Sequence, residues 1–243
     1  MHTGYQMAVY MGVRAVREFE LLSHNLANAS TVGFKRELLH LWRLPDQAAP
    51  LGARAGPAQF LDVRSRDYTQ GPFHQTGSET DLALEGPGFF KVQTPRGVRY
   101  TRSGSFRLDR ERTLVTPEGF PVLGRRGPIR AEATDQNFIV DPEGGVHLDQ
   151  ALTDQIAVVE FPNPQGLIPE GSTLFAATRE AGEEQEAVDT RVRQGEIEES
   201  NLDPVAEMVR LINLQRSFEA YLKVLESFAA SDQKVIEQVG QVA

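Results

Sequence analysis

The sequence contains no cysteine, which excludes disulfide bonds, thiol catalysis and cysteine-ligated zinc. It also lacks any apolar run of about eighteen residues, so we expect no membrane-spanning helix. Basic residues are in deficit, because 25 Lys and Arg stand against 34 Asp and Glu and give a formal net charge of -9. Since phosphate contacts need clustered basic side chains, this balance argues against a nucleic-acid-binding surface.

The N-terminus lacks the pattern of a secretory signal peptide. Met1-His2-Thr3-Gly4 is not a basic region followed by an apolar segment. We therefore expect that, if the protein leaves the cytosol, it does so by a route that uses no cleaved signal peptide.

Neither glycine nor proline occurs between Val205 and Val239. Asp203 can cap a helix there, and Pro204 suits its first position. Apolar residues recur at three- and four-residue steps, which indicates a heptad-like stripe along one helix face. The sequence thus predicts one long C-terminal helix, whose stripe consists of Met208, Leu211, Gln215, Phe218, Leu222, Leu225, Ala229, Asp232, Ile236 and Val239.

A second, narrower stripe follows helical spacing in the first thirty residues. It is rich in small residues, so another helix could approach it closely, and it consists of Tyr5, Ala8, Gly12, Ala15, Phe19, Leu22, Leu26 and Ala29. We expect the two ends of the chain to pair along these stripes. The alternative is a pair of helices packed on an ordinary globular core.

The middle of the chain has a residue pattern typical of β-strands connected by turns. Residues 73–177 contain apolar and aromatic runs at roughly ten-residue spacing, separated by turn residues. The most apolar run, 156–161, is expected to be central. The predicted fold class is therefore α+β, with an all-β central body inserted between long N- and C-terminal helices that pair as a coiled-coil-like bundle. The predicted domains are a discontinuous helical assembly domain (1–36 with 198–243), an extended connector (37–75) and a β-rich body (76–197).

No recognisable catalytic or metal-binding pattern occurs in the sequence. The five histidines are scattered, without metal-ligand spacing. Gly86-Pro87-Gly88 lacks the third glycine and the following helix of a dinucleotide-binding loop. Residues 141–149 resemble a calcium loop only faintly, and a β-hairpin explains them better. We therefore expect no enzyme activity, no cofactor and no metal.

Three segments, in the same order, resemble signatures of the bacterial flagellar rod and hook proteins. The first is Ser-His-Asn-Leu-Ala-Asn-Ala-Ser-Thr-Val-Gly-Phe-Lys-Arg at 23–36. The second lies within 75–124 and includes Gly-Pro-Gly-Phe-Phe at 86–90 and Arg-Tyr-Thr-Arg-Ser-Gly-Ser-Phe at 99–106. The third, Gln-Gly-Glu-Ile-Glu-Glu-Ser-Asn at 194–201, precedes the last helix. The chain resembles the mid-sized rod members, and its short connector favours the proximal-rod type over the distal-rod type.

The resemblance implies a structural axial subunit of the flagellar basal-body rod, which self-assembles through its terminal helices into a tubular shaft that transmits torque. The implied partners are further copies of the chain, adjacent proximal- and distal-rod subunits and the flagellar export apparatus, without nucleic acid or direct membrane insertion. The implied location is the periplasmic rod of the basal body, reached by flagellar type III export without a cleaved signal peptide. In the free monomer we expect the helices to be partly disordered.

The expected assembly interface combines residues of both stripes with residues of the first signature. It consists of Phe19, Leu22, Leu26, Asn28, Gly33, Phe34, Met208, Leu211, Gln215, Phe218, Leu222 and Leu225. Two other functions are compatible with the sequence. One is a soluble β-domain binding module dimerised by a terminal coiled coil, and the other is a hydrolase whose site lies in the β body.

Overall fold

The computed structural model describes residues 2–43, 60–131, 138–149 and 151–240, and the chain divides into two compact units. The helical unit contains residues 1–27, 37–65 and 203–243. The β body contains residues 28–36 and 66–202. Each unit is therefore assembled from segments that are far apart in the sequence.

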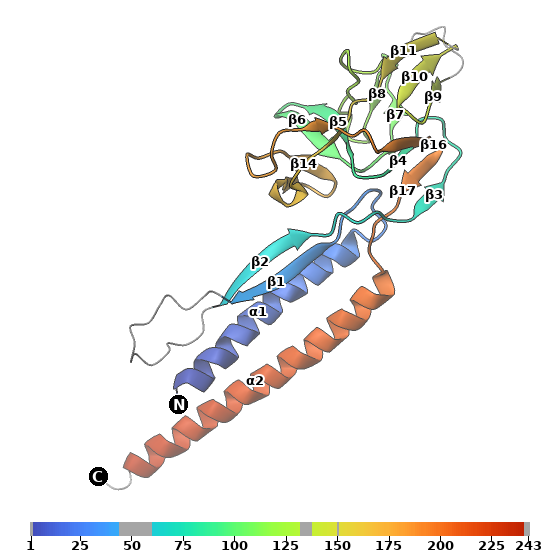
Figure 1. Ribbon diagram of the computed structural model, residues 1–243. Helices are drawn as coiled ribbons and strands as arrows, with labels where there is room; N and C mark the ends of the chain where they lie inside the picture. The colour runs from blue at the N-terminus through green and yellow to red at the C-terminus, as the bar shows by residue number, and fades with distance from the viewer. Residues whose placement is uncertain (1, 44–59, 132–137, 150, 241–243) are drawn as a thin grey trace. The chain divides into compact units, whose positions relative to one another are not determined.

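Two long helices and a two-stranded sheet make up the helical unit (Figure 1). Helix α1 (His2–Ala27) and helix α2 (Pro204–Gly240) lie side by side. Strand β1 (Glu37–Arg43) pairs with β2 (Phe60–Arg66), and β1 contacts α1. Asp203 caps α2 as predicted, because its Oδ1 accepts hydrogen bonds from the backbone N–H groups of Val205 and Ala206 at 2.9 and 3.2 Å.

The two helices do not form the predicted coiled-coil-like bundle. A coiled coil buries its seam residues in holes of the partner helix. On α2, however, no residue between 208 and 230 is buried, and the predicted seam residues Met208 and Leu222 are 49% and 44% exposed. The predicted coiled-coil-like packing is therefore wrong, whereas the described residues do have an α+β fold with helices α1 and α2 and a mostly β body.

The physical reason is that α2 carries apolar residues in two neighbouring rows. The row that is half-buried consists of Leu211, Leu214, Phe218, Tyr221, Leu225 and Phe228. It shares only every second position with the predicted stripe. At the remaining positions the two rows are one residue apart, which corresponds to a rotation of about 100° around the helix axis. The sequence pattern alone does not show which of the two rows faces α1. The side chains of Tyr5, Ala8, Asp232, Ile236 and Val239 lie outside the described residues.

The largest sheet of the β body has six strands in the order β13-β14-β6-β5-β12-β15, and all neighbours are antiparallel. Its strands are β5 (Phe89–Thr94), β6 (Gly97–Thr101), β12 (Val158–Glu160), β13 (Ile168–Glu170), β14 (Leu174–Ala176) and β15 (Gln185–Glu186), with the short 3-10 helix η1 (Pro164–Gly166) before β13. The strand predicted at 156–161 is present as the shorter β12, inside this sheet.

Smaller antiparallel sheets complete the β body. One has three strands in the order β11-β10-β9, and the others are the pairs β16-β4, β17-β3 and β7-β8. Their bounds are β3 (Phe73–Gln75), β4 (Leu82–Glu85), β7 (Arg107–Leu108), β8 (Leu114–Val115), β9 (Phe138–Val140), β10 (Gly145–Leu148), β11 (Ala151–Gln155), β16 (Arg191–Gln194) and β17 (Glu196–Glu198). In the β3-β17 pair, Phe73 lies opposite Glu198.

Strand β5 separates two hydrophobic cores, because successive side chains of a strand point to opposite faces. Phe90 and Val92 pack into the larger core, which contains Leu82, Leu114 and Val122 among others. Phe89 belongs to the second core, with Tyr100, Phe161 and Phe175 as its aromatic members. The Tyr100 and Phe161 rings meet edge to face, with centroids 4.8 Å apart. The two consecutive phenylalanines of the second signature thus fill one core each.

Candidate assembly surface

Helix α1 exposes an apolar stripe on one face. Val9, Val13 and Val16 follow the four- and three-residue steps of a single face and are 39%, 49% and 47% exposed. At about 100° per residue, the buried Ala15 and Leu22 lie on the other side of the helix. Helix α1 therefore has apolar residues on two faces, and only one of them is buried in the chain itself.

Helix α2 repeats this arrangement. Val205, Val209 and Ile212 have the same four- and three-residue spacing and are 69%, 53% and 52% exposed. They lie opposite the half-buried row that begins at Leu211. Exposed apolar stripes on soluble chains mark sites where another protein binds. These two free stripes were not identified from the sequence, because they lie outside the heptad-like pattern.

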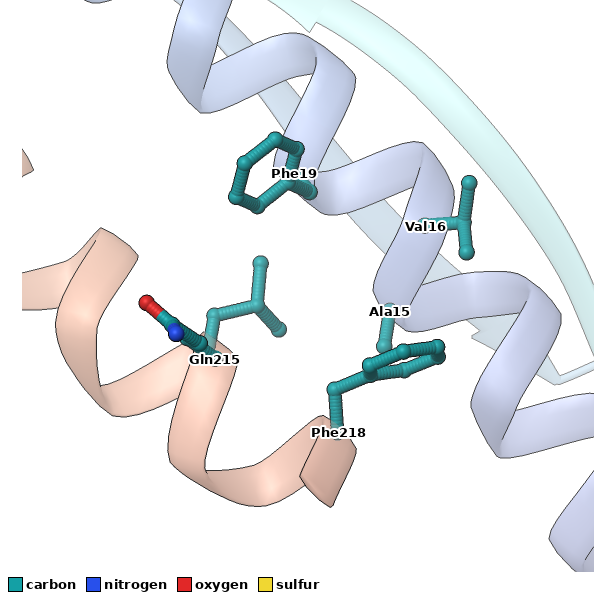
Figure 2. A pocket seen from close by; sticks show the side chains of 6 residues that line it. Ala15, Val16, Phe19, Gln215 and Phe218 are labelled. Atoms are coloured by element: carbon teal, nitrogen blue, oxygen red, sulfur yellow. The ribbon is translucent and has the colours of Figure 1, made fainter. Parts of the chain in front are cut away.

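Between α1 and α2 lies an apolar groove of about 220 Å³. Its lining consists of Ala15, Val16, Phe19, Leu214, Gln215 and Phe218. Figure 2 shows the Phe19 and Phe218 rings reaching into the space between the two helices. The groove is a place where the two helices leave apolar side chains incompletely packed against each other.

The predicted interface residues fall into two groups. Those on the helices belong to the helical unit: Phe19, Met208, Gln215 and Leu222 are exposed, Leu26, Leu211, Phe218 and Leu225 are half-buried, and Leu22 is buried. The structure brings Phe19, Gln215 and Phe218 together in the groove. Asn28, Gly33 and Phe34 belong to the β body, where all three are buried and Phe34 is completely inaccessible.

The segment around Gly33 enters a buried ionic cluster that sequence reasoning missed, formed by Lys35, Arg102 and Glu198. Lys35 Nζ lies 2.5 Å from Glu198 Oε1, and Arg102 Nη1 lies 3.4 Å from Glu198 Oε2. The Lys35 and Glu198 side chains are completely inaccessible to solvent. Burial lowers the pKa of Lys35, although the adjacent Glu198 carboxylate acts to raise it. Each of the three residues lies in a different one of the three signature segments. Their presence in these segments was the only sequence signal that could have pointed to the cluster.

Backbone hydrogen bonds converge on the same carboxylate and its own peptide. Gly71 donates its N–H to Glu198 Oε1 at 2.9 Å, and Gly33 donates its N–H to the Glu198 carbonyl oxygen at 2.7 Å. Gly33 has a φ of +69°, and a Cβ built on it would lie 2.3 Å from the backbone nitrogen of Ser103. A side chain at position 33 would therefore clash with the backbone of the second signature.

Residues 141–149 contain the expected β-hairpin, in which 141–144 form the turn between β9 and β10. Asp141 accepts hydrogen bonds from the N–H groups of Glu143 and Gly145, and its Oδ2 lies 2.7 Å from His147 Nε2. Within the described ranges, no three His, Cys, Asp or Glu residues are grouped so that they could hold a metal ion. No helix in the described part of the chain is long and apolar enough to cross a membrane.

Comparison with protein-family models gives two matches on this chain. Residues 83–148 match the model described as flagellar hook protein FlgE/F/G D1 domain. Residues 193–238 match the model described as flagellar basal body rod FlgEFG protein C-terminal. The first match lies in the β body, and the second spans the end of the β body and most of α2.

Curated proteins similar to this chain carry rod-protein names. The flagellar basal-body rod protein FlgF of Caulobacter vibrioides is 34% identical, and the alignment covers 97% of this chain and 98% of that protein. The flagellar basal-body rod protein FlgG of Borreliella burgdorferi is 32% identical over 86% of this chain and 88% of its own length. The FlgG of Bacillus subtilis is 30% identical, with coverages of 90% and 93%.

Proposed function

This chain belongs to the flagellar basal-body rod protein family, and from this premise we propose that it self-assembles through its terminal helices into a shaft that transmits torque. It is a structural protein of the flagellar basal body and serves motility. In this proposal the two helices are the assembly domain, and the β body is the folded unit that each subunit adds to the rod.

The observation that carries the proposal is the free apolar stripe on each helix. Val9, Val13 and Val16 on α1 leave large apolar area in water, as do Val205, Val209 and Ile212 on α2. Burying a methylene group contributes about 0.8 kcal/mol, so covering such stripes with neighbouring subunits supplies a substantial driving force. Contacts between two different faces of identical subunits do not close on themselves, and they generate helical filaments.

The predicted interface residues of the groove extend this surface. Phe19 and Phe218 are only partly covered within the chain, and the groove between them is apolar. We propose that a neighbouring subunit covers these side chains in the rod. Asn28, Gly33 and Phe34 are buried inside the β body, and their part in the assembly interface stays a prediction.

We further propose the proximal-rod type, with other rod proteins as axial neighbours in the periplasmic part of the basal body. The FlgF relative from Caulobacter vibrioides aligns with nearly the whole of both chains, whereas the two FlgG relatives leave about a tenth or more of this chain unmatched. The route through the flagellar type III export apparatus stays a prediction of the family resemblance.

The experiment compares self-association of the purified full-length chain and three single variants. Val13→Glu and Ile212→Glu each place a charge on one free stripe, and the introduced glutamate is itself a good helix-forming residue. Val188→Glu is the matched control, since Val188 is 85% exposed in the β body. Sedimentation velocity as a function of concentration measures association, and circular dichroism checks that the fold is retained.

We expect the parent chain and Val188→Glu to form open-ended assemblies at high concentration, and both stripe variants to remain monomeric. Hydrogen exchange on the dilute and concentrated parent chain should show increasing protection of α1 and α2, while β5 and β6 stay protected throughout. A small oligomer of fixed size, or stripe variants that associate like the parent, would contradict the proposal.

A further inference from the structure

Two passages of the chain connect the β body to the helices. Residues 28–36 follow α1, and residues 198–202 precede α2. Inside the β body these passages are tied together by hydrogen bonds between segments more than 160 residues apart. Gly33 donates to the Glu198 carbonyl oxygen, and the backbone N–H of Arg36 donates to Asn201 Oδ1 at 2.9 Å. The ionic cluster of Lys35, Arg102 and Glu198, here called the clasp, lies at this crossing.

We propose that Glu198 is a positioning residue. Through the clasp it fixes the position of residues 28–36, which lead to α1, relative to residues 198–202, which lead to α2. Rod assembly requires this fixed register of the two passages. The inference rests on the proposed function, since it concerns subunits that assemble through both helices. The chain also passes between the two units at 36–37 and at 65–66, so the clasp secures the two connections that lie next to α1 and α2.

The charges of the clasp are unbalanced, which makes the contribution of Glu198 distinguishable from that of Lys35. Two cations, Lys35 and Arg102, share the single carboxylate of Glu198. Removing Glu198 leaves both cations in a buried site, whereas removing Lys35 leaves a one-to-one pair of Arg102 and Glu198. A buried charge that loses its partner is strongly destabilising. Glu198 should therefore be the more sensitive position.

Hydrogen bonds to neutral backbone carbonyl groups complete the site around both cations. Lys35 Nζ donates to the Thr69 carbonyl oxygen at 2.7 Å, and Arg102 Nη2 donates to the Gly86 carbonyl oxygen at 2.6 Å. Glu198 is the acceptor that both cations share, and it also accepts from the Gly71 N–H. The carboxylate thus ties together the 33–36, 69–71 and 102 segments as well as its own.

The experiment uses the full-length chain with Glu198→Gln, Lys35→Met, the double variant and Glu199→Gln. Glu199 is the matched control, because it is the next residue in the chain and its side chain is about half exposed. Equilibrium unfolding in urea measures stability. Hydrogen exchange is read at the amides of Gly33 and Gly71, which bond to Glu198, and at the β5-β6 ladder as an internal reference. Sedimentation measures assembly under conditions where circular dichroism shows each variant folded.

We expect Glu198→Gln to lower the folding equilibrium constant about a hundredfold or more and Lys35→Met about tenfold or less, and we expect the double variant to recover part of the Glu198→Gln loss. In Glu198→Gln the amides of Gly33 and Gly71 should exchange at least tenfold faster while β5-β6 protection is kept, and assembly should be lost. The double variant should regain assembly in part, and Glu199→Gln should behave as the parent.

Two results would overturn the inference while leaving the proposed function intact. One is a Glu198→Gln chain that assembles normally although Gly33 and Gly71 exchange fast. The other is an equal loss for both single variants without recovery in the double variant. If the parent chain itself does not assemble, the proposed function and the assembly requirement fail, whereas the unfolding and exchange data still decide whether the clasp fixes the register.

Discussion

The side-chain amide of Asn25 makes two hydrogen bonds to the backbone of Glu37. Its Nδ2 donates to the Glu37 carbonyl oxygen at 2.9 Å, and its Oδ1 accepts from the Glu37 N–H at 3.0 Å. Asn25 is completely buried near the end of α1, and Glu37 is the first residue of β1. The amide therefore fixes where β1 begins relative to the helix.

Replacing Asn25 with Asp tests this link without changing the size of the side chain. An ionised carboxylate cannot donate to the Glu37 carbonyl oxygen, and it would be buried without compensation. We expect Asn25→Asp to lower the free energy of unfolding by about 3 kcal/mol and to speed amide exchange in β1. Asn213→Asp, at an exposed position of α2, should have little effect on either measurement. Equal losses in the two variants would show that the paired hydrogen bonds are unimportant.

Gly104 is a position where only glycine fits. A Cβ built on it would lie 1.5 Å from the Leu82 carbonyl oxygen, and the Leu82 N–H is itself bonded to the Gly104 carbonyl oxygen at 2.9 Å. Because backbone lies on both sides of the contact, neither segment can move away cheaply. We expect Gly104→Ala to destabilise the β body by roughly 3 kcal/mol or more in chemical unfolding.

Gly12 provides the same substitution with the opposite expected sign. It lies inside α1, and no atom is within 4 Å of a Cβ built on it. Gly12→Ala should therefore stabilise the helix by about 0.5–1 kcal/mol in the dilute chain, as judged by thermal unfolding followed at 222 nm. If Gly104→Ala were as harmless as Gly12→Ala, the close approach of residues 82 and 104 would be wrong.

Acid should weaken the β body through Asp141. Burial acts to raise the pKa of this carboxyl group, but the hydrogen bonds from His147 and the Gly145 N–H outweigh it and hold the pKa below its usual range. A carboxyl group with a depressed folded-state pKa contributes stability above its unfolded pKa, and the contribution is lost as the pH falls through the folded value. The free energy of unfolding should therefore decrease below about pH 4.

Asp141→Asn should remove part of this dependence. We expect the variant to be less stable than the parent at pH 6, and the difference between the two to shrink between about pH 4 and pH 2. Urea unfolding at a series of pH values measures the slope. Glu118→Gln, in an exposed turn, is the control and should follow the parent curve. A constant difference between Asp141→Asn and the parent across this range would exclude the carboxylate as the source.

Local sequence signals predicted most of the elements. Strands β5, β6, β9 and β14 lie within residues 73–177, where the sequence predicts strands, because each is rich in apolar or β-branched residues. Asp203 caps α2 because its side chain is next to the free N–H groups it serves. Strand β1 falls in the segment that the sequence predicts only as an extended connector, because its partner β2 begins at Phe60 and pairing at that distance leaves no local pattern.

Long-range relationships could not be read from the sequence. The row of α2 that is half-buried, beginning at Leu211, depends on the rotation of the helix, and apolar residues occupy the adjacent row as well. Lys35, Arg102 and Glu198 were present in the three signatures, but nothing in their spacing indicates that they meet. Their encounter depends on how the β body closes, which is a property of the tertiary structure.

The pairing of β3 with β17 has a consequence for how such a chain can change over evolution. Phe73 and Glu198 lie opposite each other, so the two ends of the segment between them, residues 74–197, are close together in space. A segment whose ends are neighbours can be enlarged, shortened or exchanged without altering the path of the chain outside it. The intervening residues can thus vary in number with the terminal helices unchanged, provided that the segment at 102–103, which contacts Glu198 and Gly33, is kept.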